Sequence, residues 1–291
     1  MNTSIIDIKG ITKHYKKFSL GPIDFQVEEG TAVAVVGANG SGKTTFFRMM
    51  MNLIQADGGS IHLFGQDFAS NETEIKQKIG YVGDLLEPFG HLTVKELASL
   101  IAYWYPTWDQ PHCALLLKRY SIDEEQKFGK CSKGTKKKVE FIFALCHETK
   151  ILLLDEPSAG VDIVSQQKMK EDLMNYMEDG ERSIILATHN IDEIKQLCDS
   201  ITLLDNGKII ATFDKDEIHE KWARLWVSHL SEALKDQPHV IKLDANPPQI
   251  VTNHLPVIEK ELEESGISIS HINRLSLEEV IEQMISRGQS K

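Results

Sequence analysis

A glycine-rich turn between two apolar segments constrains this chain more than any other feature. Residues 37–44 read GANGSGKT and fit the pattern G-x-x-x-x-G-K-[ST] at every specified position. The apolar, β-branched run at 31–37 predicts a buried strand, and the segment TTFFRMMMNLI after the turn predicts a helix. Glycine residues let the backbone wrap closely around a phosphate, which the inward N–H groups and the helix N-terminus attract. The turn therefore predicts a site for a nucleoside triphosphate.

The end of this motif supplies polar side chains for phosphate and metal. Lys43 offers a positive charge to the β- and γ-phosphates, and the Thr44 hydroxyl can bind Mg²⁺. The residues of this segment that we expect to bind nucleotide are Gly37, Asn39, Gly40, Ser41, Gly42, Lys43, Thr44 and Thr45.

Two further segments place polar residues at the ends of apolar strands. Asp155 and Glu156 follow the run ILLL, and His189 ends the run IILATH. Ligands of open parallel sheets gather at the carboxyl ends of the strands. We expect Asp155 to face the metal ion and Glu156 to face an attacking water molecule.

Composition excludes some classes of protein. The chain has 291 residues and a net charge of -11, which argues against a general nucleic-acid binder. Its four cysteines lack metal-ligand spacing, so we expect buried, unreactive thiols. No apolar run reaches the roughly 18 residues of a membrane span, and the first ten residues do not resemble a signal peptide. These features predict a cytoplasmic protein.

The order of the segments predicts an α/β fold. Residues 5–29 alternate as antiparallel strands do, and residues 93–146 are mostly helical, with Thr93 and Ser132 placed to begin helices. Buried strands then alternate with helices up to a hairpin that turns at Asn206-Gly207, which predicts a mostly parallel sheet. We expect residues 214–291 to form a small α+β appendage. Its predicted helices are 216–226, 256–265 and 276–287, and its predicted strands are 239–245 and 267–272.

Over residues 1–213 the ordered motifs resemble the ATP-binding cassette (ABC) ATPase family. GANGSGKTT resembles its Walker A motif and LLLDEP its Walker B motif, in which Glu156 matches the general base. Tyr15 matches the aromatic residue that stacks on adenine. SAGVD resembles the D-loop, which implies a nucleotide contact for Asp162, and His189 matches the histidine that contacts the γ-phosphate. The resemblance implies a P-loop NTPase core, an N-terminal antiparallel β subdomain and a helical signature subdomain.

Two motifs depart from the common form of the family. The signature, usually LSGGQ, reads CSKGT here and retains Ser132 and Gly134, which would contact the γ-phosphate held by an opposite subunit. In the segment IGYVGD, Asp84 stands where the family has glutamine. An aspartate there can still bind metal, but it adds negative charge near Asp155 and Glu156, so we expect altered metal affinity.

The resemblance implies an ATPase subunit that drives a membrane transporter, with ATP and Mg²⁺ as cofactors. Two cassettes, identical or different, would close head to tail on the inner face of the cell membrane, and a separate chain would form the transmembrane permease. The form of the signature and of the segment at Asp84 favours ABC-2-type exporters of peptides, antibiotics, lipids or polysaccharides. Two alternatives are a nucleotide-gated regulatory module with little hydrolysis and a soluble ABC protein that acts on ribosomes or nucleic acid.

Two clusters have less specific interpretations. The run Lys136–Lys138 suggests a solvated helix face rather than a nucleic-acid site, with one lysine able to approach nucleotide across a dimer. The aromatic residues Tyr103, Trp104, Tyr105 and Trp108 are consistent with core packing or with a groove that receives a cytoplasmic helix of the membrane subunit.

Overall fold

The computed structural model describes residues 4–288, without the side chains of residues 219, 235, 236 and 286–288. Contacts divide it into two units. The first comprises the residues before Asp199 together with Leu204–Ile209, and the second comprises Asp199–Leu203 and the residues from Ile210 onward. The division passes through a hairpin close to the boundary predicted at 213/214. That residues 1–213 and 214–291 have different functions stays a prediction.

An antiparallel sheet of four strands begins the chain. Its order is β2-β1-β4-β5, and β1 pairs antiparallel with both β2 and β4. Apolar residues on one face of β2 are buried while the polar residues between them are exposed, as the alternating sequence predicts. The strands are β1 (Ser4–His14), β2 (Ser19–Glu28), β4 (Gly58–Leu63) and β5 (Gln66–Asp67).

A second sheet carries the glycine-rich turn. Its order is β10-β9-β3-β8-β7-β6, and the pairs β3/β8, β8/β7 and β7/β6 are parallel, which confirms the predicted sheet. Every residue of β3, β7 and β8 is buried, because helices and the first sheet cover this part on both faces. The strands are β3 (Ala32–Val36), β6 (Ile79–Val82), β7 (Ile151–Asp155), β8 (Ser183–Ala187), β9 (Ser200–Asp205) and β10 (Lys208–Asp214).

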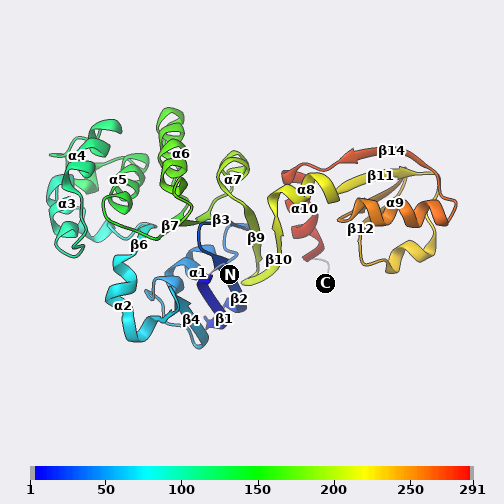
Figure 1. Ribbon diagram of the computed structural model, residues 1–291, viewed down its shortest axis with the longest axis horizontal. Coiled ribbons are helices and arrows are strands. Elements are labelled where there is room, and N and C mark those ends of the chain that lie inside the picture. The colour runs from blue at the N-terminus through cyan, green and yellow to red at the C-terminus, as the bar shows by residue number, and fades with distance from the viewer. Residues whose placement is uncertain (1–3, 289–291) are drawn as a thin grey trace. The chain divides into compact units, whose positions relative to one another are not determined.

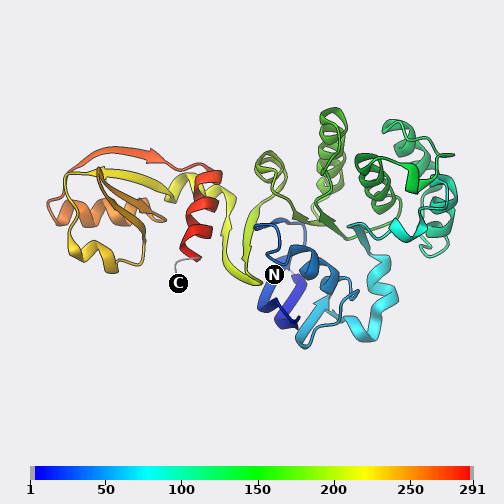
Figure 2. The ribbon, with the colours of Figure 1, turned by 180° about the vertical axis from the view of Figure 1, so that it is seen from behind.

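Helices lie on both sides of this sheet in the first unit. Figures 1 and 2 show α5, α6 and α7 on one side and α1 with the antiparallel sheet on the other. Thr93 begins α3 with a complete capping box, as its position in the sequence predicts. The helices are α1 (Lys43–Met50), α2 (Phe68–Gln77), α3 (Val94–Ala102), α4 (Gln110–Arg119), α5 (Lys133–Leu145), α6 (Ile163–Met177) and α7 (Ile191–Leu197), with short 3₁₀ turns at Glu87–Phe89 and Phe128–Lys130.

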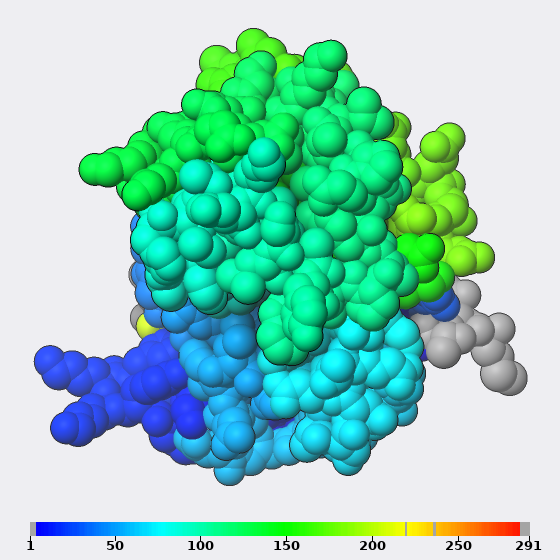
Figure 3. Space-filling model, turned by 90° about the vertical axis from the view of Figure 1, so that its left-hand side faces the viewer, coloured from blue at the N-terminus to red at the C-terminus, as the bar shows by residue number. Residues whose placement is uncertain are grey.

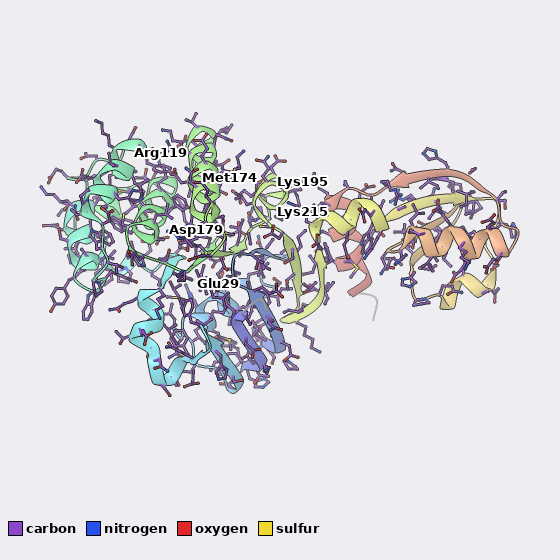
Figure 4. All side chains as sticks on the ribbon, viewed as in Figure 1. Glu29, Arg119, Met174, Asp179, Lys195 and Lys215 are labelled. Atoms are coloured by element: carbon purple, nitrogen blue, oxygen red, sulfur yellow. The ribbon has the colours of Figure 1, made fainter. Side chains whose placement is uncertain are left out.

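The helical part of this unit contains α3, α4 and α5. Figure 3 shows the face on which the residues of α3 and α4 lie above the segment that contains α2. Arg119, labelled in Figure 4, connects α4 to α6 through Glu171 at 2.7 Å and Asp172 at 3.3 Å.

The second unit is α+β, as predicted, but one predicted helix is too long. The helix expected over 216–226 ends at Lys221, because residues 223–227 alternate between buried and half-buried and pair with two strands. The strand β13 was not predicted. The elements are α8 (Lys215–Lys221), β11 (Ala223–Val227), a 3₁₀ turn (Glu232–Asp236), β12 (Val240–Ala245), β13 (Pro248–Thr252), α9 (Leu255–Glu264), β14 (Ile269–Arg274) and α10 (Leu277–Gly288), and the sheet order is β12-β13-β11-β14.

Two expectations from composition can be compared with the structure. All four cysteines are free and buried, as predicted. Within residues 4–288, no helix combines the length and the apolar character that a membrane span requires.

Candidate functional site

The glycine-rich turn joins β3 to α1 and needs glycine for two separate reasons. Gly40 and Gly42 have φ angles of 83° and 111°, a region that other residues rarely adopt. A Cβ atom on Gly37 would lie 2.0 Å from the carbonyl oxygen of Leu204, so no side chain fits there. Backbone conformation and close packing thus explain three glycines of the motif.

Lys43 is the first residue of α1 and is buried. Its Nζ donates hydrogen bonds to the carbonyl oxygens of Gly37 at 2.7 Å and Ala38 at 3.3 Å. These bonds hold the ammonium group against the turn, where the sequence predicts the phosphates. The Ser41 hydroxyl of the same turn is buried without a hydrogen-bond partner.

Asp155 and Thr44 form the part of the site that fits a metal ion. Asp155 ends β7, and its carboxylate accepts a hydrogen bond from the Thr44 hydroxyl. Burial raises the pKa of Asp155, while this hydrogen bond and the charges of Lys137 and Lys43 oppose the rise. A buried carboxylate beside a hydroxyl suits Mg²⁺, which proteins hold through one or two side chains together with substrate phosphates. Among the side chains that the structure describes, there is no group of three or more His, Cys, Asp or Glu that could hold a metal ion.

Glu156 and His189 come from neighbouring strands and contact each other. The Glu156 Oε1 atom lies 2.8 Å from His189 Nδ1, and the Glu156 N–H donates to the carbonyl oxygen of Ala187 at 2.9 Å. Glu156 has a φ angle of 51°, a strained conformation for a residue other than glycine. The turn after β7 thus directs Asp155 to the buried hydroxyl and Glu156 to the histidine. The sequence predicted both residues but not their mutual contact.

Two hollows of about 270 and 290 Å³ surround these side chains. Together they bring most of the predicted Walker A and Walker B residues and His189 to one place. The first is lined by Phe18, Asn39, Gly40, Gly42, Lys43, Thr44, Thr45, Asp155 and Glu156. The second is lined by Asn39, Thr44, Asp84, Lys133, Lys137, Asp155, Glu156, Ala159 and His189.

The aromatic residue that lines the first hollow is Phe18 rather than Tyr15. The Tyr15 side chain is exposed, and its ring stacks on that of Phe18 with 6.4 Å between centroids. A Cβ atom on Gly42 would lie 2.9 Å from the Phe18 ring. The adenine contact of Tyr15 stays a prediction, and Phe18 is a neighbour of the phosphate turn that the sequence analysis missed.

The signature residues lie at the start of α5. Ser132 caps the helix, since its hydroxyl accepts a hydrogen bond from the Thr135 N–H at 3.1 Å. Gly134 is buried, and a Cβ atom there would lie 2.2 Å from the carbonyl oxygen of Gly160. Backbone packing therefore requires glycine at 134. Ser132 is exposed, so its hydroxyl lies at the surface, where it caps the helix and can also face a ligand from outside this chain.

Asp162 has a structural role in addition to its predicted nucleotide contact. It caps α6 by accepting the Ser165 N–H at 2.9 Å, and this hydrogen bond is the main cause that lowers the pKa of Asp162 to about 2. Lys138 lies 3.5 Å from the same carboxylate. The nucleotide contact itself stays a prediction.

The prediction of a solvated lysine run was wrong for its middle residue. Lys137 is only 3% exposed, and its Nζ lies 2.9 Å from Asp84 Oδ1. In an α-helix, three consecutive residues point about 100° apart, so one of them can face the core while the others do not. Lys136 instead pairs with Glu87 on the surface.

The aromatic cluster divides into packed and exposed side chains, and its role as a receptor for a helix of the membrane subunit stays a prediction. Tyr105 packs on His147 with 4.0 Å between ring centroids, and Trp108 packs on Phe143. Tyr103 and Trp104 are 81% and 66% exposed. An apolar groove of about 250 Å³ is lined by Met51, Tyr81, Gly83, Leu85, Leu86, Ile101, Trp104, Tyr105, Glu140, Phe143, Ala144 and His147.

The burial of His147 in this groove leads us to expect that the stability of the fold depends on pH. Burial lowers its pKa below the 6.5 of an exposed histidine, so the unfolded chain takes up the proton at a higher pH. We expect the free energy of unfolding to fall as the pH drops below about 6.5, by at most about 1.4 kcal/mol per pH unit from this one group.

Urea unfolding between pH 7.5 and 5.5 measures this effect. His147→Gln keeps an amide that can replace the hydrogen bond from Nε2 to the Ile79 carbonyl, but it does not titrate. Its stability should depend less on pH than that of the wild type. An equal dependence in both proteins would show that His147 is not responsible.

Known proteins are similar to this chain in sequence. The family model for the ABC transporter matches residues 20–159. An uncharacterized ABC transporter ATP-binding protein of Methanocaldococcus jannaschii is 31% identical over 222 residues, which cover 75% of this chain and 80% of that protein. The bacitracin transport ATP-binding protein BcrA of Bacillus licheniformis is 26% identical over 268 residues, 91% of this chain and 84% of the relative.

Solved structures share the fold of about three quarters of the chain. The structure of an ATP-binding subunit of an ABC transporter has a TM-score of 0.67 at 26% identity, covering 74% of this chain and 92% of that one. A dimeric ATP-binding cassette with bound ADP and Pi has a TM-score of 0.64 at 21% identity, covering 72% and 98% of the two chains. The motifs, the geometry of the site and the extent of these matches lead to one conclusion: this chain belongs to the family of ABC transporter ATP-binding proteins.

Proposed function

We propose that this chain hydrolyses Mg²⁺-ATP at a site that it completes with a second cassette, and that closure of the pair drives an exporter. As a member of the family, the chain binds and hydrolyses ATP and powers a membrane transporter. The observation that carries the residue assignment is the convergence of Lys43, Thr44, Asp155, Glu156 and His189 at the carboxyl ends of neighbouring parallel strands.

Each side chain has a task that follows from its chemistry. The Lys43 ammonium group would exchange its hydrogen bonds to the carbonyl oxygens of Gly37 and Ala38 for contacts with the β- and γ-phosphates. Thr44 and Asp155 would hold Mg²⁺. The metal would neutralise charge that develops on the phosphates. The Glu156 carboxylate can accept a proton from the attacking water, and the bond from His189 orients that carboxylate.

A second cassette is proposed because the signature lies at the surface, where ATP bound to another chain can reach it. Ser132 is exposed, and Gly134 fixes the signature against the backbone at Gly160. A head-to-tail pair would place Ser132 and Gly134 of one subunit over the ATP of the other, with Asp162 and Tyr15 as further contacts. The dimeric state of one similar structure supports a pair of cassettes. The second cassette is either another copy or a different chain.

The membrane partner is proposed to occupy the apolar groove beside Trp104 and Tyr105. Exposed aromatic side chains around an apolar depression are suited to receive a helix. A separate permease subunit would supply that helix, which places this chain on the inner face of the cell membrane. The bacitracin transport relative covers most of this chain and supports an antibiotic or peptide as cargo. We assign residues 1–213 to ATP hydrolysis and residues 214–291 to dimerisation or regulation.

Mg²⁺-dependent ATP hydrolysis measured against protein concentration tests this proposal. Turnover per subunit should rise steeply with concentration and then level off, because only the paired form is competent. Removal of Mg²⁺ with a chelator should abolish turnover. A turnover per subunit that stays constant over a wide range, in a protein that sediments as a monomer throughout, would contradict a shared site.

A further inference from the structure

A buried lysine connects the proposed metal site to the edge of the apolar groove. Lys137 lies one turn into α5, and its Nζ donates to the backbone carbonyl of Asp155 at 3.2 Å. The same atom lies 2.9 Å from Asp84 Oδ1 and 3.8 Å from Glu140 Oε2. All three contacts are with oxygen atoms, as a buried ammonium group requires.

Glu140 is the second buried charge of this cluster. It is 4% exposed, and its Oε2 accepts the backbone N–H of Asp84 at 3.2 Å. Burial raises the pKa of Glu140, and the charge of Lys137 opposes that rise. Glu140 thus holds the backbone of Asp84, and Lys137 holds its side chain.

These contacts hold a turn whose backbone conformation is unfavourable. Asp84 has a φ angle of 60°, which is unfavourable for a residue with a Cβ atom. Its neighbours Gly83 and Leu85 line the apolar groove, whereas Asp84 and Lys137 line the hollow that contains Asp155. One lysine therefore reaches both the strand end of the metal site and the turn at the groove.

The charge of Lys137 also bears on the negative charge that Asp84 adds to the site. An unpaired aspartate beside Asp155 and Glu156 would add negative charge to the site. The ammonium at 2.9 Å offsets that charge, so the two residues together are neutral. Lys137 therefore opposes the change in metal affinity expected from Asp84, which stays a prediction.

We propose that Lys137 is a positioning residue for ATP hydrolysis, which holds Asp84 against the end of β7 and cancels its charge. This inference rests on the proposed function of the site. Loss of Lys137 should impair the hydrolytic step more than nucleotide binding. Neutralising Asp84 at the same time should restore part of the activity, because it removes the charge of Asp84 that Lys137 no longer offsets.

The test compares Lys137→Met, Asp84→Asn and the double variant in the full chain. We expect Lys137→Met to lower kcat about tenfold and to raise the Mg²⁺ concentration needed for half-maximal turnover. ATP binding without Mg²⁺, measured by equilibrium dialysis, should stay within about twofold of the wild type. The double variant should turn over at least about threefold faster than Lys137→Met alone. As a control, Lys95→Met removes an exposed lysine that pairs with Glu125 and should behave like the wild type.

The result that would overturn the inference is equal turnover in Lys137→Met and wild type, or a double variant no faster than Lys137→Met. If Lys137→Met does not fold, the substitution is made together with Glu140→Gln, so that both buried charges are removed. Turnover of this double variant is then compared with that of Glu140→Gln alone, and equal turnover would again overturn the inference. The proposed function is tested separately, by loss of wild-type turnover on Mg²⁺ removal and in Glu156→Gln. If those losses occur and Lys137→Met is fully active, the inference alone fails.

Discussion

Glu156→Gln should lower kcat for ATP hydrolysis by about 10²- to 10⁴-fold, the range that a general base contributes. The amide has the same shape as the carboxylate but cannot accept a proton from water. The Glu156 side chain contacts His189 rather than the glycine-rich turn that is proposed to hold the phosphates, so ATP affinity should change little. Steady-state turnover and equilibrium ATP binding, measured on the same preparation, separate the two effects.

A matched substitution distinguishes this result from a general effect of removing a charge. Glu125→Gln neutralises an exposed carboxylate that pairs with Lys95, and it should leave turnover unchanged. If Glu156→Gln retained more than about a tenth of wild-type turnover, Glu156 could not be the base.

Gly134→Ala should destabilise the first unit by about 3 kcal/mol or more. Alanine is the better helix former by about 1 kcal/mol, so propensity alone favours the substitution. The new Cβ atom, however, would lie 2.2 Å from the carbonyl oxygen of Gly160, and neither backbone can move away cheaply. The clash therefore outweighs the gain, and it should also displace the signature and reduce turnover.

Urea unfolding of Gly134→Ala beside Lys133→Ala measures this effect. Lys133 precedes Gly134 in the same helical turn and is exposed, so its replacement should change stability by less than about 0.5 kcal/mol. A Gly134→Ala protein as stable as the wild type would show that the two backbones can separate without cost.

The sequence predicted the parts of the molecule that depend on local rules. The turn at 37–44 has a pattern that a phosphate requires, and Thr93 caps its helix through contacts within four residues. The buried strands β3, β7 and β8 were predictable because short, continuous runs of apolar and β-branched residues are typical of strands that are covered on both faces. These local signals also located Asp155, Glu156 and His189 at the strand ends.

What the sequence could not show depends on contacts between distant segments. Lys137 has a polar sequence context, and only the positions of Asp84 and Glu140 explain why it is buried. Phe18 lies in the turn between β1 and β2 and approaches Gly42 of the glycine-rich turn. No sequence spacing predicts this contact. The helix predicted over 216–226 was too long because pairing with β13 and β14 takes residues 223–227 into a sheet.

The central claim is that one chain supplies the phosphate turn and another supplies the signature. Mixing two inactive variants tests it most directly. Lys43→Ala removes the proposed phosphate contact, and Ser132→Arg places a bulky side chain at the signature. Neither protein alone should hydrolyse ATP.

An equal mixture of the two should recover about a quarter of wild-type turnover, because about half of the dimers are mixed and each holds one intact site of two. Chains with different affinity tags show by co-purification whether mixed dimers form. Recovery of turnover in the mixture is the predicted result. Mixed dimers that form but remain as inactive as either parent would contradict a site shared between two copies of this chain.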